Sequence, residues 1–242
     1  MSSNGIRVVM VMNRKGGCGK STLVKGLASA AAERGETVTI FDTDQSQSSY
    51  LWMCSGQERG NWDPLVSVIP SMDAGEVAEA IDQIYTLPDQ EHLVLIDSFG
   101  GGAAAQDEMV LKSHLVAVPT KLSRSDVSET RQTLLWHARL KERVPDPDAV
   151  PPISVVINAV PYRRSEAEEA AIVEMVTQMP TLPEPVMQRA AYLRLDLEGL
   201  LGPIRDSLSN PGVARHLSNA VAEMDMVLTE IDQAIRGEAD HG

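Results

Sequence analysis

The chain has 242 residues and a net charge of −13 at pH 7, with 43% hydrophobic and 23% charged residues. This length and composition fit one globular domain, over residues 1–242, with a sizeable core. Two cysteines exclude a disulfide framework, and no signal peptide or apolar run near the ~20 residues of a membrane span is present. We therefore expect a cytoplasmic protein. Its acidity disfavours a diffuse electrostatic hold on nucleic acid or anionic lipid, so any DNA contact needs a local basic patch.

Short apolar runs that lack polar alternation predict buried strands. Segments with helical periodicity lie between them, and two of these begin with capping-box spacing, Asp73 with Glu76 and Ser165 with Glu168. Strands that alternate with helices predict an α/β fold with three layers, a mostly parallel central sheet flanked by helices. Ligands of such folds bind beyond the carboxyl ends of the strands. The predicted strands are Ile6–Asn13, Val38–Asp42, Val66–Ile69, Leu93–Asp97, Leu115–Pro119 and Ile153–Asn158; the longest predicted helices are Ser21–Arg34, Ser125–Arg143 and Pro211–Arg236.

A glycine-rich segment directly follows the first strand and directly precedes the first helix, which is the context that a phosphate-binding P-loop requires. Its glycines let backbone N–H groups converge on phosphate oxygens, and the helix N-terminus adds its dipole. Lys20 is placed to contact the β- and γ-phosphates, and the Ser21 hydroxyl to bind Mg²⁺. We expect a P-loop NTPase whose nucleotide-binding residues are Lys15, Gly16, Gly17, Cys18, Gly19, Lys20, Ser21 and Thr22.

The fourth strand supplies an acidic partner for this loop. Leu93–Asp97 consists of four apolar residues that end in Asp97, the form of a Walker B strand. Its carboxylate can reach Mg²⁺ directly or through water. Ser98-Phe99-Gly100-Gly101-Gly102 follows, where a γ-phosphate sensor is expected. A P-loop and a Walker B strand in this order predict an ATP and Mg²⁺ site.

The loop sequence Lys15-Gly16-Gly17-Cys18-Gly19-Lys20-Ser21 resembles the deviant Walker A motif, K-G-G-x-G-K-[ST], of the ParA/MinD superfamily of ATPases. In place of the first glycine of the generic motif stands Arg14. The resemblance implies that Lys15 reaches across a nucleotide-sandwich homodimer formed on ATP binding and acts with Lys20 in catalysis. It also implies that Asp44 orients the attacking water, that Asp42 holds the outer shell of Mg²⁺, and that Asn158 binds the adenine edge.

Two features refine this resemblance. Gln45 and Ser46 stand where the family has proline and glutamine in its D-x-D-P-Q switch, which leaves the hydrolysis rate open. Short segments resemble small plasmid-partition ATPases, among them a Q-R-x-x-Y segment that ends at Tyr192 and lies near the nucleotide base in that family. Others resemble the VirC-type branch, which assists conjugative DNA transfer: Asp97–Gly101, Trp62–Pro64 and Val118–Thr120.

The resemblance implies an ATP-switched dimer that binds DNA non-specifically, associates with the nucleoid and positions a plasmid, a conjugative DNA complex or a protein assembly. A small adaptor or a ParB-like stimulating protein is the expected partner. No membrane contact is expected, because the last helix carries an acidic face. The candidate DNA-binding cations are Lys121, Arg124, Arg131, Arg139, Lys141, Arg143, Arg163 and Arg164; the acidic residues of the last helix are Glu223, Asp225, Glu230 and Asp232.

Other classes of P-loop protein remain alternatives. A nitrogenase-reductase relative needs two cysteines placed to share an iron–sulfur cluster, and Cys18, inside the phosphate loop, with Cys54 does not meet that need. A dethiobiotin-synthetase-like ligase stays open, although no substrate site is recognisable. An adaptor that binds ATP without hydrolysing it is a third alternative, which the unusual Gln45 makes credible.

Overall fold

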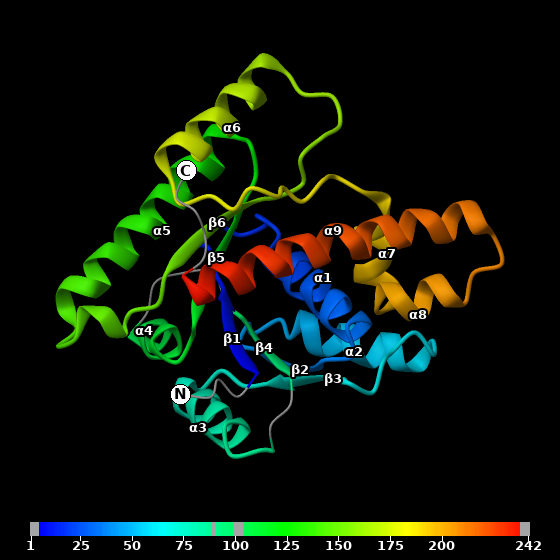
Figure 1. The fold of residues 1–242 in the computed structure, drawn as a ribbon, viewed down its shortest axis with the longest axis horizontal. Coiled ribbons are helices and arrows are strands. Elements are labelled where there is room, and N and C mark those ends of the chain that lie inside the picture. Colours follow the sequence, from blue (N-terminus) through cyan, green and yellow to red (C-terminus); the bar gives the residue numbers. More distant parts are fainter. Residues whose placement is uncertain (1–4, 89–90, 99–103, 238–242) are drawn as a thin grey trace.

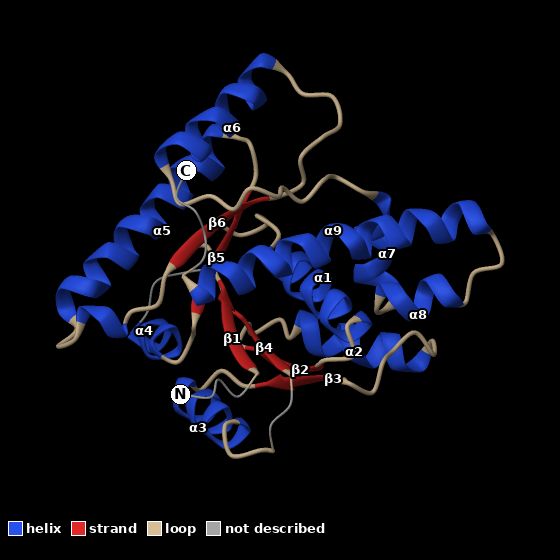
Figure 2. Ribbon diagram, viewed as in Figure 1, coloured by secondary structure: helices blue, strands red, loops and turns tan. Residues whose placement is uncertain are grey.

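The computed structural model describes residues 5–88, 91–98 and 104–237. Within these ranges six parallel strands form one sheet in the order β3-β2-β4-β1-β5-β6, with helices on both faces (Figures 1 and 2). The expected α/β class and central parallel sheet are confirmed. The strands are β1 (Ile6–Val11), β2 (Thr37–Asp42), β3 (Val66–Pro70), β4 (His92–Asp97), β5 (Leu115–Thr120) and β6 (Ile153–Ile157).

Helices connect these strands and cover the sheet. Every predicted strand appears within two residues of its expected bounds, and the helices predicted from periodicity are present. Four helices were not predicted: α2, α4, α7 and α8. The helices are α1 (Lys20–Glu33), α2 (Ser48–Glu58), α3 (Ala74–Ile84), α4 (Ala104–Leu111), α5 (Arg124–Arg143), α6 (Glu166–Gln178), α7 (Ala190–Glu198), α8 (Leu201–Asp206) and α9 (Pro211–Arg236).

Two apolar layers, one on each side of the sheet, explain why the strand sequences lack alternation. In β1, Val9 packs into the layer beneath α1, α7, α8 and α9, whereas Met10 packs into the layer beneath α3, α4 and α5. Both side chains are fully buried. Because both faces of a central strand are covered, every position of β1 except Arg7 is apolar, and Arg7 pairs with Glu36 and Asp232.

Helix α9 lies along the sheet beside α1 and α8 (Figure 1). Its predicted apolar stripe does face the domain, and Leu217 and Leu228 are buried in the core. The expected acidic face is wrong for two of its four members, because Glu223 and Asp232 are 2% and 6% exposed. Arginines from distant parts of the chain pair with both carboxylates, which offsets the cost of burying the charges.

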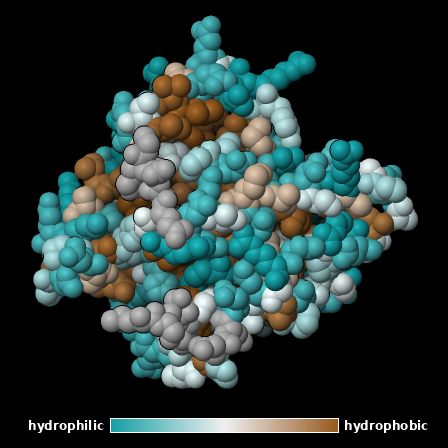
Figure 3. Space-filling view, viewed as in Figure 1, coloured by the Kyte–Doolittle hydropathy of each residue, from teal (hydrophilic) through white to brown (hydrophobic). Residues whose placement is uncertain are grey.

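The two predicted capping residues are confirmed. The Asp73 side chain accepts a hydrogen bond from Glu76 N at the start of α3, and Ser165 with Glu168 forms a full capping box at the start of α6. In the face shown in Figure 3, brown atoms gather over α6, where Val173 and Val176 are 60% and 59% exposed. Helix α6 therefore presents apolar side chains to solvent as well as to α5. Among the described residues, no helix is long and apolar enough to cross a membrane.

Candidate nucleotide-binding site

The glycine-rich loop joins β1 to α1 at the carboxyl edge of the sheet. Asn13, which is 1% exposed, begins it: Nδ2 donates to Pro119 O at 2.9 Å and Oδ1 accepts from Lys15 N at 3.1 Å. Gly17 and Gly19 have φ angles of 73° and 103°, a left-handed region that other residues rarely adopt. A Cβ added at Gly17 would meet nothing within 4 Å, so the space beside this part of the loop is open.

A buried side chain directly after β6 holds the other end of the loop. Asn158, 4% exposed, donates from Nδ2 to Cys18 O at 3.0 Å. A Cβ on Gly19 would lie 1.8 Å from that same nitrogen, so only glycine fits there. Sequence reasoning assigned Asn158 to the adenine edge, whereas its amide N–H group here donates to the loop backbone. The Cys18 thiol is fully buried, and burial raises its pKa, so it stays protonated and unreactive.

The two loop lysines point to different places. Lys20 Nζ lies 3.4 Å from Asn13 O and 3.5 Å from Lys15 O, so it lies over its own glycine-rich loop. Lys15 extends away: its Nζ lies 2.7 Å from Asp126 Oδ1 and 2.7 Å from Ser125 Oγ at the start of α5. Lys20 is therefore available to a phosphate bound in the loop, whereas Lys15 is held outside it.

Two of the predicted acidic residues lie side by side, because Asp42 and Asp97 are register partners at the ends of β2 and β4. Asp42 Oδ2 accepts from Ser49 N at 2.8 Å and Tyr50 N at 3.0 Å, so it caps α2. Asp97 Oδ2 accepts from Ser49 Oγ at 2.7 Å. Burial, followed by the nearby Asp42 charge, raises the pKa of Asp97 to about 6, although hydrogen bonds from Ser49 and Ser21 oppose the shift.

Asp44 lies at the mouth of the same site. Its Oδ1 accepts from Ser46 N at 2.9 Å, and hydrogen bonds from Ser46 hold the pKa of this carboxyl below its usual value. The neighbouring Lys20 acts in the same direction. Asp44 is therefore ionised at neutral pH and can accept a hydrogen bond from a water molecule. Of the predicted γ-phosphate sensor, Ser98 donates to Val11 O, and residues 99–102 lie outside the described residues.

These residues surround one cavity of about 600 Å³. Its volume is in the range of small-molecule sites. The predicted residues that it brings together come from the loop, from the ends of β2 and β4, and from the residue after β6. Another wall of the cavity is formed by the segment before α7 and by α7 itself. Only the family resemblance had placed this segment near the nucleotide. The lining includes Gly16, Gly17, Gly19, Lys20, Ser21, Thr22, Asp44, Asp97, Asn158, Met187, Gln188, Arg189 and Tyr192.

The donor set suits a magnesium ion that also binds phosphate. Mg²⁺ prefers oxygen ligands and usually takes one or two carboxylates besides the phosphates and water. The Asp97 carboxylate and the Ser21 hydroxyl both line the cavity, and Asp42 is the register partner of Asp97. A cation here would favour the charged form of Asp97, which burial alone disfavours. No cluster of three or more metal-binding side chains occurs in the described part of the chain.

Two residues with a part in the site were missed by sequence reasoning. Asp126 lies 111 positions after the Lys15 that it binds, and only its spacing from the N-cap Ser123 marks it in the sequence. Burial acts to raise the pKa of Asp126, but hydrogen bonds from Lys15 and Ser123 outweigh it and hold this pKa below its usual value. Glu223 resembled a solvated helix residue, yet it is 2% exposed and accepts hydrogen bonds from the cavity wall.

A parallel sheet with this loop, helix and pair of strand-end carboxylates defines a P-loop NTPase of the ParA/MinD superfamily. The VirC1 protein family model matches residues 6–237, and the chain belongs to the VirC1 family. It is 28% identical over 187 residues to Protein virC1 of Rhizobium radiobacter, covering 77% of this chain and 79% of the relative.

Two further comparisons are with a ParA protein and with a MinD structure of similar fold. Protein ParA of Rhizobium radiobacter is 23% identical over 231 residues, which cover 95% of this chain and 99% of the relative. Among solved structures, the septum site-determining protein MinD of Pyrococcus horikoshii, complexed with Mg-ADP, has a TM-score of 0.64 at 18% identity, covering 97% of this chain and 99% of that chain. The chain is thus related to partition and positioning ATPases.

Proposed function

We propose that this protein is an ATP-driven switch: it dimerises on binding ATP and Mg²⁺, hydrolyses ATP slowly, and as a dimer binds DNA non-specifically to position a DNA complex or another large cargo. The observation that carries the proposal is the separation of the two loop lysines. Lys20 lies over its own loop, whereas Lys15 is directed outward and is held by Asp126 and Ser125. Lys15 would reach the phosphates of a second subunit by exchanging Asp126 and Ser125 for them when the dimer forms.

The residues of the cavity suggest how each step is performed. Loop N–H groups and Lys20 bind the phosphates, and Ser21 with Asp97 would hold Mg²⁺, which neutralises phosphate charge when bound. Asp44, ionised and at the cavity mouth, would orient a water molecule by accepting its hydrogen bond. Lys15 of the second subunit would add positive charge near the γ-phosphate. The MinD structure of similar fold, which is complexed with Mg-ADP, supports the proposal that the cavity binds a nucleotide together with Mg²⁺.

Turnover and assembly test this proposal. The molar mass in solution is measured by light scattering with ADP-Mg²⁺ and with ATP-Mg²⁺, using Asp44→Ala to slow hydrolysis. Lys15→Ala and Lys20→Ala form a matched pair. We expect Lys15→Ala to bind nucleotide as a monomer without turnover, and Lys20→Ala to lose nucleotide binding. A protein that stays monomeric with ATP would contradict the proposal and favour a metabolic ligase. A dimer that never releases phosphate would favour a non-hydrolysing adaptor.

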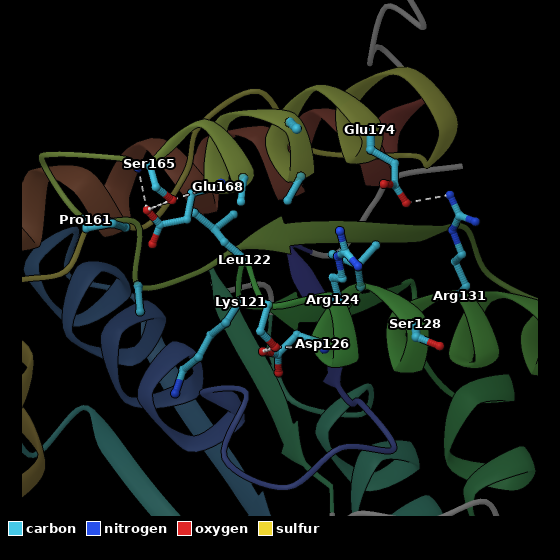
Figure 4. A pocket seen from close by; sticks show the side chains of 16 residues that line it. Lys121, Leu122, Arg124, Asp126, Ser128, Arg131, Pro161, Ser165, Glu168 and Glu174 are labelled. Atoms are coloured by element: carbon cyan, nitrogen blue, oxygen red, sulfur yellow. Dashed lines mark hydrogen bonds and ion pairs between the residues drawn. The ribbon is translucent and has the colours of Figure 1, made fainter.

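Three of the candidate DNA-binding cations are already in ion pairs with carboxylates of the same chain. Arg131 pairs with Glu174, Arg143 with Asp107 and Arg164 with Glu169. Figure 4 shows the first of these pairs across the groove between α5 and α6, whose volume is about 930 Å³. Cations neutralised in this way contribute little to phosphate binding.

Three other candidates near this groove form no ion pair within the described residues: Lys121, Arg124 and Arg163. Lys121 and Arg124 line the groove, and Arg163 lies in the loop between β6 and α6. We infer that these cations make the local basic patch that a chain of net charge −13 needs to contact DNA phosphates. Phosphate contacts require charge and position but no particular base.

A charge-matched comparison tests the DNA surface. The double variant Arg124→Ala/Arg163→Ala removes two unpaired cations, and Arg131→Ala/Arg164→Ala removes two paired ones. Binding of labelled duplex DNA is measured with ATP across a salt series. We expect the first variant to weaken binding about tenfold or more and to reduce the salt slope by about 2 for each subunit that contacts the DNA. We expect the second variant to change little. Equal losses in both variants would show that overall charge, not this patch, determines binding.

A further inference from the structure

One carboxylate buried in α9 accepts hydrogen bonds from four donors. Glu223 Oε1 accepts from Met187 N at 3.0 Å and from Tyr192 Oη at 2.6 Å. Its Oε2 accepts from Arg189 Nε at 2.8 Å and from Arg189 Nη2 at 2.6 Å. The Glu223 side chain is 3% exposed, so these bonds form out of contact with water, where charge-assisted hydrogen bonds are strong.

All four donors belong to the segment 187–192, which forms one wall of the nucleotide cavity. Arg189 also donates from Nη1 to Tyr162 Oη at 2.8 Å. Burial, followed by the Glu223 charge, raises the pKa of Tyr192, so its hydroxyl stays protonated and donates. The side chains of Arg189 and Tyr192 both line the cavity, but their polar groups are already hydrogen-bonded to Glu223.

The glutamine of the same segment is different. The side chain of Gln188 is exposed, lines the cavity and makes no hydrogen bond within the described residues. Its main chain is nevertheless fixed, because Gln188 N donates to Val160 O at 2.8 Å and Met187 N is bonded to Glu223. The position of the amide is therefore set while its donor and its acceptor are free. An amide with both groups free matches the adjacent donor and acceptor on an adenine edge.

We propose that Gln188 reads the purine base of the nucleotide and that Glu223 is the positioning residue that holds the base-contacting wall in place for it. This inference rests on the proposed function, because it assumes that the cavity binds ATP. Two different residues then hold the two ends of the cavity. Asn158 holds the phosphate loop through Cys18 O, and Glu223 holds the base-contacting wall, residues 187–192.

Helix α9 supplies a matched control for Glu223. Glu230 lies two turns further along the same helix and accepts a hydrogen bond from Glu184 N at 2.9 Å. Both glutamates thus fasten the connecting segment to α9, but Glu184 is not among the residues that line the nucleotide cavity. Loss of the Glu230 carboxylate should leave the base wall where it is.

The experiment compares dissociation constants for ATP, GTP and inorganic triphosphate, each with Mg²⁺, by calorimetry on the full chain. We expect Glu223→Gln to weaken ATP binding about tenfold, the effect of one charge-assisted hydrogen bond, without changing triphosphate binding. We expect Gln188→Ala to reduce the preference for ATP over GTP about tenfold, again with unchanged triphosphate binding. Glu230→Gln should match the wild type for all three ligands. A thermal melt of each variant checks that it is folded.

Four outcomes would overturn the inference. If Glu223→Gln weakened ATP and triphosphate by the same factor, Glu223 would support the fold in general and not the base wall. If Glu223→Gln failed to fold, Gln188→Ala would decide, because its side chain is exposed; wild-type selectivity in that variant would refute base reading. A wild-type chain that bound neither ATP nor triphosphate would refute the proposed function itself, whereas normal binding with unaffected variants would refute only this inference.

Discussion

Replacing Asn158 with alanine tests what holds the phosphate-binding loop in position. The Asn158 amide and the Cys18 carbonyl, 3.0 Å apart, join the end of β6 to a loop 140 residues earlier in the chain. Alanine removes this hydrogen bond and takes a donor away from a buried carbonyl. A net hydrogen bond contributes about 1 kcal/mol and a buried group that loses its partner costs about 1–3 kcal/mol. We therefore expect the loop conformation that binds the ligand to be destabilised by about 2 kcal/mol.

At about 1.4 kcal/mol per factor of ten, this loss corresponds to about thirtyfold weaker binding. Under the proposed function the loop binds phosphates, so the binding of ATP and of inorganic triphosphate should weaken by the same factor in calorimetric titrations with Mg²⁺. The control is Gln188→Ala, which should affect ATP alone. If Asn158→Ala weakened ATP but left triphosphate binding unchanged, the reasoning from Cys18 would be refuted. The adenine role implied by the family resemblance would then be favoured.

Three further predictions concern the loop backbone, a buried ion pair and a buried histidine. Gly19→Ala should abolish measurable ATP binding, because its Cβ would lie 1.8 Å from a buried amide nitrogen; Gly35→Ala, with a positive φ but open space, is the control, and equal ATP affinity in both would refute the steric argument. Asp232→Asn removes a carboxylate that two arginines share and should lower the free energy of unfolding in urea by about 3 kcal/mol. The exposed pair broken by Asp82→Asn should cost under about 1 kcal/mol, and similar losses would contradict this ranking. Burial lowers the pKa of His137, so as the pH falls below about 6.5 the unfolded chain takes up a proton before the folded chain does. The free energy of unfolding should therefore fall between pH 7.5 and 5.5, and His137→Gln should reduce this dependence on pH. An unchanged dependence on pH in that variant would show that other groups cause it.

The sequence alone determined the strands and the phosphate loop, because both depend on local features. Strands buried on both faces are apolar at most positions, so the apolar run that ends at Asp97 is recognisable without its neighbours. A phosphate loop needs glycines at positive φ angles between a strand and a helix, and this local requirement fixed Gly17 and Gly19. The caps at Asp73 and Ser165 depend on residues three positions away and were likewise predictable.

Tertiary structure decided the elements and side chains whose partners are distant in the chain. Helix α2 was not predicted because its first turn is capped by Asp42, the last residue of a strand. The burial of Glu223 depends on Arg189, which lies 34 positions earlier, and no local pattern distinguishes this glutamate from a solvated one. Asp126 meets Lys15 only because β1 and β5 are adjacent in the sheet. The sequence by itself thus specified the glycine-rich loop between β1 and α1. Only the folded chain determined which carboxylates hold the loop lysine and the opposite wall, because ion pairs form between charges that the fold, not the sequence spacing, brings together.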